Sequence, residues 1–265
     1  MCRLRGSRSR RCRRTPGLLT TASAGAGAPP DLYLRMPKAS RNSFKYLKTL
    51  SNDRPTRLTA ESLRAAASAL AARDPHLAAI HRVHSTPPMW ARRPGFPTLL
   101  RILLEQQVSL VSARAMFGRL QVNIEPFNAE GFINAGEMHL RSLGVTRQKA
   151  HYCIQIAQAF INGRLERIGR MNDQDAHARL LSIKGVGPWT ANIYLLMALR
   201  RPDIWPDGDV ALATAVGRLR KMKTRPAFTE LAQIAENWRP YRSVAARMLW
   251  QYYLAERDGS KRSAS

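Results

Sequence analysis

Residues 181–216, LSIKGVGPWTANIYLLMALRRPDIWPDGDVALATAV, contain the pattern that decides the fold. A helix ends before the Gly-Val-Gly turn at 185–187, Pro188 opens a second helix expected to reach Leu199, and Asp209 follows. Glycines permit positive φ and close approach of another backbone. The amides that start the next helix carry partial positive charge. The stretch predicts a cradle for a phosphate-like anion with a carboxylate held at a fixed distance, although such a turn can also be an ordinary helix connection.

The rest of the chain after residue 57 follows the same helical periodicity. The expected helices begin after Thr59, at Pro75, behind Pro97, at Ser109, after Thr146, at Asp173 or Asp175, at Pro188, at Val210, at Phe228 and at Tyr241. The piece 122–124 is a weak strand candidate. The predicted class is all-α, with about ten helices in two lobes over residues 56–260.

Charge is the strongest compositional signal. The 265 residues carry a formal net charge of +25, a pI near 11.4 and 45% apolar residues. Residues 1–57 account for +12 and residues 58–265 for +13, so the body is basic without the tail. Such a balance favours a polyanionic partner, most often nucleic acid. No apolar run has the roughly 18 residues that a membrane span needs, so no membrane association is expected.

The first 55 residues are treated as a basic, disordered extension. They are rich in Arg and Ser and cannot bury enough surface to fold. They have some transit-peptide character, but they can equally be an upstream extension of a chain that begins at Met36. For a bacterial source the expected location is the cytoplasm, at the nucleoid, and a targeting role of the extension stays open.

The metal-binding residue types are too few and too scattered for a cofactor site. The three cysteines, Cys2, Cys12 and Cys153, form no CxxC pair, so neither structural zinc nor an iron–sulfur cluster is expected. His81 and His84 share a helix face but lack a carboxylate or cysteine partner in the sequence. We therefore predict no metal site and no cofactor.

The stretch LLSIKGVGPWTANIYLL resembles the hairpin of the helix-hairpin-helix (HhH-GPD) DNA glycosylase superfamily. Further similarity lies in LLRILLEQQVSLVSARA, GVTRQKAHY and WRPYRSVAARMLW, so the resemblance covers about residues 75–255. It implies a two-lobed helical fold with the active-site cleft between the lobes. The spacing from Gly187 to Asp209 is similar to that of the alkylated-base branch, the bacterial 3-methyladenine DNA glycosylase II type.

The resemblance gives Asp209 the catalytic role. Breaking an N-glycosidic bond builds positive charge on the deoxyribose, which a carboxylate stabilises while it orients the attacking water. The alternative is that Asp209 only caps the helix that starts at Val210. Asp207 falls outside the matched position and is expected to be a solvated loop residue. The hairpin residues expected at a DNA phosphate are Lys184, Gly185, Val186 and Gly187.

The resemblance also indicates a monofunctional enzyme. Family members that cut the DNA backbone carry a lysine just before the Thr-Ala of the hairpin helix, where this chain has Trp189. Trp189 is instead expected to line the base pocket together with Trp205 and Trp90. Plain core packing is the alternative for each of these indoles.

Gln107 matches the family residue that wedges into the duplex when the target base is flipped out. Two exposed amides at a helix end are the plainer interpretation. The basic residues expected to meet phosphates are Lys184, Arg218, Arg220, Lys221, Lys223, Arg239, Arg242 and Arg247. The family also allows a cation on the hairpin carbonyls.

The predicted activity is hydrolytic removal of alkylated purines from damaged double-stranded DNA by a monomer, without a lyase step. Two alternatives stay open at this point. One is a glycosylase for uracil, hypoxanthine or oxidised bases, and the other is a non-catalytic helix-hairpin-helix module that only binds DNA.

Overall fold

The computed structural model describes residues 56–262, and the predicted extension 1–55 lies outside the described residues. Every regular element in 56–262 is helical, which confirms the predicted all-α class. The strand candidate at 122–124 was wrong, because these residues are the last turn of a helix and its C-cap. None of the helices in the described range has the length and apolar character to cross a membrane.

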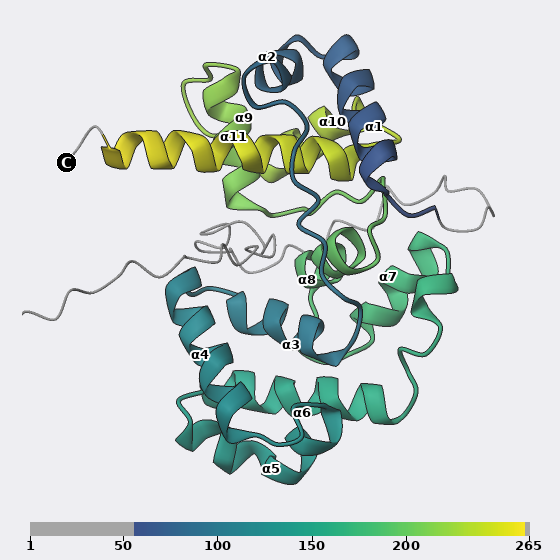
Figure 1. Cartoon of the computed structure of the whole chain (residues 1–265), viewed down its shortest axis with the longest axis vertical. Helices are drawn as coiled ribbons and strands as arrows, with labels where there is room; N and C mark the ends of the chain where they lie inside the picture. The colour runs from purple at the N-terminus through teal and green to yellow at the C-terminus, as the bar shows by residue number, and fades with distance from the viewer. Residues whose placement is uncertain (1–55, 263–265) are drawn as a thin grey trace, which may run out of the picture.

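The helices divide into two lobes (Figure 1). Their bounds are α1 (Ala60–Arg73), α2 (Pro75–His84), α3 (Phe96–Glu105), α4 (Leu110–Asn123), α5 (Ala129–Ser142), α6 (Arg147–Ile161), η2 (Ile168–Arg170), α7 (Asp173–Leu181), α8 (Pro188–Ile193), η3 (Tyr194–Ala198), α9 (Val210–Leu219), α10 (Phe228–Glu236) and α11 (Arg242–Arg262). One lobe packs α1, α2 and α9 to α11 together, and the other packs α3 to α6. Helices α7 and α8 lie between them, and the chain crosses through residues 85–95 and again through 199–209.

Side-chain caps fix where the helices begin. Thr59 forms a capping box with the first turn of α1, and Thr146 accepts from the Lys149 N–H at the start of α6, both as predicted from the sequence. Helix α7 is capped by Asn172 instead of Asp173 or Asp175. The two acids fall inside the first turn, where negative charge still favours the helix dipole.

The helix opened by Pro188 does not continue regularly to Leu199. After α8 the backbone widens into the π-helical segment η3, in which the Leu199 N–H donates to the Tyr194 carbonyl at 3.1 Å. In η3 the Leu196 carbonyl accepts a hydrogen bond from Arg247 of α11 at 2.8 Å. A π segment often marks a functional region, and here it lies directly between the hairpin and the segment that carries Asp209.

Arg247 joins three segments at the lobe boundary. It is fully buried and donates to the carbonyls of Met89 at 2.9 Å, Ser243 at 2.9 Å and Leu196. No carboxylate pairs with it within residues 56–262, and burial lowers its pKa to about 9. Its role is structural, so the prediction that Arg247 contacts DNA phosphate was wrong.

The buried guanidinium generates a stability prediction. Arg247→Leu keeps much of the volume but leaves three buried carbonyls without their donors, so we expect the free energy of unfolding to fall by about 3 kcal/mol. The matched control is Arg225→Leu, because Arg225 is exposed and forms no ion pair with the described residues. The control should change stability by less than about 0.5 kcal/mol. Urea unfolding measures both, and equal midpoints for the two variants would contradict the structural role.

Candidate active site

The two hairpin glycines serve different purposes. Gly185 has a left-handed φ of +94°, and a Cβ on it would lie 2.4 Å from Cγ of Tyr152 on α6. Gly187 has an ordinary φ of −87°, and a Cβ there would meet no atom within 4 Å. The close approach expected at this turn is therefore to a side chain at Gly185, whereas Gly187 faces open space.

The open side of the turn presents backbone N–H groups. Gly187 is the N-cap of α8 but has no side chain to cap it, and the first intrahelical bond runs from the Ala191 N–H to the Gly187 carbonyl at 2.9 Å. N–H groups ahead of that bond point outward and favour an anion. Val186 is buried and Lys184 is exposed beside the turn. The geometry fits an anion contact made by backbone and Lys184.

Asp209 connects the hairpin helix to α9. As the N-cap of α9 it accepts the Leu212 N–H on Oδ1 at 2.9 Å, and its Oδ2 accepts the Trp189 indole N–H at 3.2 Å. Trp189 is the second residue of α8, directly after the hairpin. The carboxylate is thus held by backbone on one oxygen and by an indole on the other. Asp209 therefore caps α9, which was the alternative role considered for it, and it also lies next to the hairpin helix.

The Asp209 carboxylate is buried, with 2% of the residue exposed. The side chain is kept from solvent because capping turns it back over the first turn of α9. Burial raises the pKa of Asp209 to about 6, and the hydrogen bonds from Leu212 and Trp189 partly oppose that rise. A carboxyl with a pKa near neutrality in an apolar setting is typical of a group that acts in catalysis.

A second indole, that of Trp250, lies at this carboxylate, and Trp90 packs against it. Trp250 of α11 is fully buried, and its N–H favours the charged form of Asp209 without reaching the geometry of a full hydrogen bond. The Trp250 ring packs edge-on against Trp90 at 6.4 Å between centroids. Trp90 has a left-handed φ of +45°, an unusual conformation for a bulky residue that is often found at functional sites. Trp250 ends the matched stretch WRPYRSVAARMLW, but it was not among the residues predicted for the base pocket.

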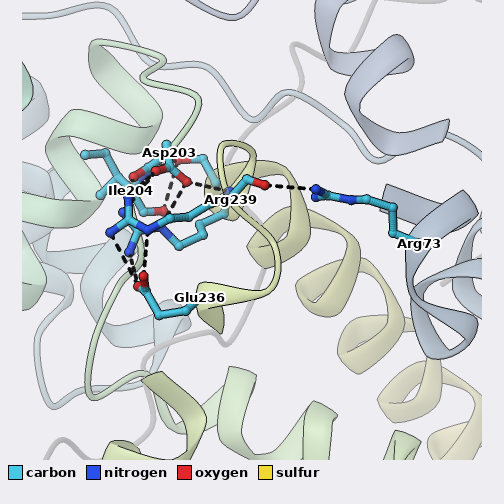
Figure 2. A network of polar contacts seen from close by, with 7 residues as sticks. Arg73, Asp203, Ile204, Glu236 and Arg239 are labelled. Carbon is cyan, nitrogen blue, oxygen red and sulfur yellow. Dashed lines mark hydrogen bonds and ion pairs between the residues drawn. The ribbon is translucent and has the colours of Figure 1, made fainter. Parts of the chain in front are cut away.

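The segment before Asp209 is clamped to the start of α11 by an ion network (Figure 2). The Asp203 carboxylate accepts from Arg239 at 2.8 Å and from the Arg242 Nε at 2.9 Å. Glu236 accepts from the same two arginines at 2.6 and 2.7 Å. Arg73 of α1 donates to the Arg239 carbonyl at 3.0 Å, which ties the network to the first helix.

A hydroxyl completes the clamp. The Ile204 N–H donates to Ser243 Oγ at 2.9 Å, and Ser243 Oγ donates to the Ile204 carbonyl at 3.0 Å. The segment 203–209 is therefore fixed at one end by α11 and at the other by the cap on α9. This frame determines where Asp209 lies.

The network corrects two sequence expectations. Arg239 and Arg242 were expected at DNA phosphates, but their guanidinium groups are taken by Asp203 and Glu236. Asp207 was expected to be solvated, but it is half-buried. Burial raises the pKa of Asp207 to about 6, with Arg242 lowering it and Glu236 raising it. Neither correction could be read from position along the chain.

Trp205 belongs to a neighbouring cluster. Its ring packs on Trp238 at 5.5 Å, and the Trp238 indole donates to Asp74 at 2.8 Å, where α1 meets α2. A cleft of about 400 Å³ opens beside Trp238. It is lined by Arg73, Asp74, Pro75, His76, Arg220, Asn237 and Trp238. Its walls include none of the residues predicted for the base pocket, so the place of Trp205 in that pocket stays a prediction.

Gln107 lies at an exposed turn between α3 and α4. Its φ is +57°, so the backbone there is left-handed. The preceding Gln106 is half-buried, and its side-chain amide donates to the Thr190 hydroxyl of α8. The turn that presents Gln107 is therefore attached to the helix that follows the hairpin.

In the described part of the chain, no three His, Cys, Asp or Glu side chains lie close enough together to hold a metal ion. Cys153 is buried, and burial raises the pKa of its thiol to about 12. Such a thiol is a poor nucleophile and a poor metal ligand.

Comparison with known proteins places this geometry in context. Residues 100–240 match the family described as HhH-GPD superfamily base excision DNA repair protein. A DNA-3-methyladenine glycosylase of Bacillus subtilis is 37% identical over 114 residues, which are 42% of this chain and 38% of the relative. The chain therefore matches well under half the length of that relative.

Two solved structures support the fold. The Schizosaccharomyces pombe 3-methyladenine DNA glycosylase bound to abasic DNA gives a TM-score of 0.64 at 23% identity, over 71% of this chain and 95% of that one. An 8-oxoguanine glycosylase/lyase of Clostridium acetobutylicum gives 0.61 at 18% identity, over 73% and 70% of the two chains. At these identities the likeness shows the fold alone, the two-lobed helical arrangement predicted from the sequence.

The two glycines generate a matched pair of substitutions. Gly185→Ala forces a Cβ against Tyr152 and strains a left-handed backbone, so we expect a loss of about 3 kcal/mol in the free energy of unfolding. Gly187→Ala has neither problem and should stay within about 1 kcal/mol of the wild type. Urea unfolding of both variants checks this, and equal losses would show that the glycines are not distinct.

The raised pKa of Asp209 generates a pH prediction. The folded protein binds this proton with a pKa of about 6, against about 3.9 in an unfolded chain, so stability falls as pH rises between these values. Asp209→Asn keeps an acceptor for the Leu212 N–H and removes the ionisation. The amide NH2 of the variant then faces the Trp189 N–H, a cost that does not depend on pH. We therefore expect the stability of the variant relative to the wild type to rise by about 2 kcal/mol from pH 4 to pH 8. Identical pH dependence of the two unfolding midpoints would contradict the assigned pKa.

Proposed function

The chain belongs to the HhH-GPD superfamily of base excision DNA repair proteins, and we propose that it is a monofunctional DNA glycosylase. Its substrate is duplex DNA with an alkylated purine of the 3-methyladenine type, and its product is an abasic site. The observation that carries the proposal is the buried Asp209 carboxylate bonded to Trp189 at the start of the hairpin helix. The name of the Bacillus subtilis relative supports the substrate class.

Asp209 acts on the bond between C1′ of the deoxyribose and the base nitrogen. As that bond breaks, positive charge develops on the sugar, and a carboxylate in an apolar setting stabilises it far more than one in water. Each carboxylate oxygen already accepts one hydrogen bond, Oδ1 from the Leu212 N–H and Oδ2 from the Trp189 indole, so the sugar and the attacking water use the lone pairs that remain on Oδ2. Because the carboxylate is buried, the flipped nucleotide has to enter beside the Trp189 indole and take its place next to Oδ2.

The indoles supply recognition of the damaged base. A methylated purine carries positive charge, and the faces of electron-rich rings attract it by about 0.5–2 kcal/mol. Trp189 donates to Asp209, Trp250 lies at the same carboxylate, and Trp90 packs against Trp250. The same positive charge weakens the bond to the sugar, so a broad aromatic pocket is sufficient for catalysis.

The hairpin and the exposed turn hold the DNA. A phosphate accepts from the N–H groups around Gly187, with Lys184 adding charge, and Gln107 fills the gap that the flipped base leaves. Both groups lie on segments attached to α8. The strand is thereby gripped on either side of the nucleotide that reaches Asp209.

The absence of a lyase step is supported by the groups around Asp209. The position just before the Thr-Ala of the hairpin helix, where lyases of this family carry a lysine, is Trp189 here, and its indole donates to Asp209. Lys184 lies on the exposed side of the turn. A water molecule is therefore the proposed nucleophile, although a glycosylase/lyase shares the fold and makes the point worth testing.

Strand cleavage after alkali tests the assignment. With a methylated duplex in single turnover, we expect the wild type to give breaks only after alkali treatment and Asp209→Asn to be slower by about 100-fold or more. The matched control is Asp207→Asn, a loss of one carboxylate two residues away, which should stay within several-fold of the wild type. Mass spectrometry of bases released from alkylated, deaminated and oxidised DNA identifies the substrate class.

Three outcomes would overturn parts of the proposal. Equal rates for wild type and Asp209→Asn would remove the catalytic role of Asp209. Breaks without alkali would show a lyase. Release of uracil, hypoxanthine or oxidised bases in preference to methylated purines would change the substrate class.

A further inference from the structure

Side chains from three places in the chain hold the C-terminal end of α3. Glu105, the last residue of this helix, is 2% exposed and pairs with Arg92 at 3.1 Å and with Arg101 at 3.0 Å. A carboxylate at a helix C-terminus is unfavourable for the helix dipole, so two guanidinium groups are needed to stabilise it there. These contacts fix the helix up to the residue before the turn.

The last carbonyls of α3 need donors from elsewhere, because a helix leaves its final C=O groups without intrahelical partners. Lys149 of α6 supplies them. Its Nζ donates to the Leu104 carbonyl at 2.8 Å and to the Gln106 carbonyl at 2.7 Å. A cation at this end of a helix also complements the dipole. The ammonium thus bridges the last turn of α3 and the first residue beyond it.

In the turn that follows α3, the first residue is held by contacts and the second is exposed. Gln106 is held at its carbonyl by Lys149 and at its side chain by Thr190, whereas Gln107 is exposed in a left-handed conformation. A left-handed backbone costs about 1–3 kcal/mol in a residue with a side chain and persists only where its surroundings impose it. Lys149 provides part of that constraint from the lobe opposite to Asp209.

From these contacts we infer that Lys149 is a positioning residue for the turn Gln106–Ser109, which it holds in the shape that inserts Gln107 into the duplex. The inference rests on the proposed function, in which Gln107 fills the space of the flipped base. Lys149 donates to the carbonyls of Leu104 and Gln106, whereas the groups that bond to the Asp209 carboxylate are Leu212 and Trp189. Its loss should therefore slow extrusion of the base and leave bond cleavage intact.

Two substrates separate extrusion from cleavage. One is a duplex with a methylated purine in a normal pair, and the other has the same base opposite an abasic-site analogue, where no pair has to be broken. In single turnover, we expect Lys149→Met to lose about tenfold on the paired substrate and less than twofold on the unpaired one. The matched control is Arg147→Met, an equal charge loss at an exposed site on the same helix, which should leave both rates within twofold.

A double-mutant cycle shows whether Lys149 acts through Gln107. If it does, Lys149→Met combined with Gln107→Ala should be no slower on the paired substrate than Gln107→Ala alone. Additive losses, equal losses on both substrates, or an unchanged rate for Lys149→Met would each overturn the inference. Thermal unfolding is measured first, and if Lys149→Met does not fold, Lys149→Gln, which keeps one donor, is compared in the same way.

The same data separate this inference from the proposed function. If Gln107→Ala alone leaves the rate on the paired substrate unchanged, the proposed wedge role fails, and the role of Lys149 fails with it. If Gln107→Ala is slow and Lys149→Met is not, only the positioning role of Lys149 is wrong. A 2-aminopurine placed beside the target base reports extrusion directly by its fluorescence.

Discussion

The bond from the Trp189 indole to the Asp209 carboxylate is the contact on which the rest of the structure depends. It joins the helix after the glycine turn to the helix that begins the last part of the chain. A buried carboxylate is unfavourable for folding unless donors surround it, and here an amide and an indole only partly offset that cost. The protein therefore keeps in its interior an ionisable group whose charged form is unfavourable there, as expected where chemistry requires such a group.

The arginines of this chain are of two kinds, those that form bonds inside the fold and those that are exposed to solvent. Arg247, Arg242 and Arg239 bind carbonyls and carboxylates inside the fold, and they fix the segment that leads to Asp209. Others, such as Arg225 and Arg218, are exposed. The net charge includes the buried arginines and the exposed ones equally. The basic composition favours a nucleic-acid partner, but it overstated how many cations are available to a phosphate.

Local rules predicted much of the fold and part of the site. Helix starts at Thr59, Pro75 and Pro188 follow from capping and from the fixed φ of proline, which act over a few residues. Trp189 and Asp209 are 20 positions apart in the sequence, and the match to a family pattern placed the two side chains in one site. That match did not reveal that the carboxylate is buried, because burial depends on side chains contributed by other helices.

What could not be predicted involves partners far apart in sequence. Asp203 and Arg242 are 39 residues apart, and Arg247 and Met89 are 158 apart. The type of one residue does not predict which distant residue will be its partner. The fit of Tyr152 against Gly185 is of the same kind, since the ring occupies the volume that a Cβ would need. Across related sequences, the glycine should therefore stay whatever residue stands at position 152, because its left-handed φ strains any other residue even where space is free.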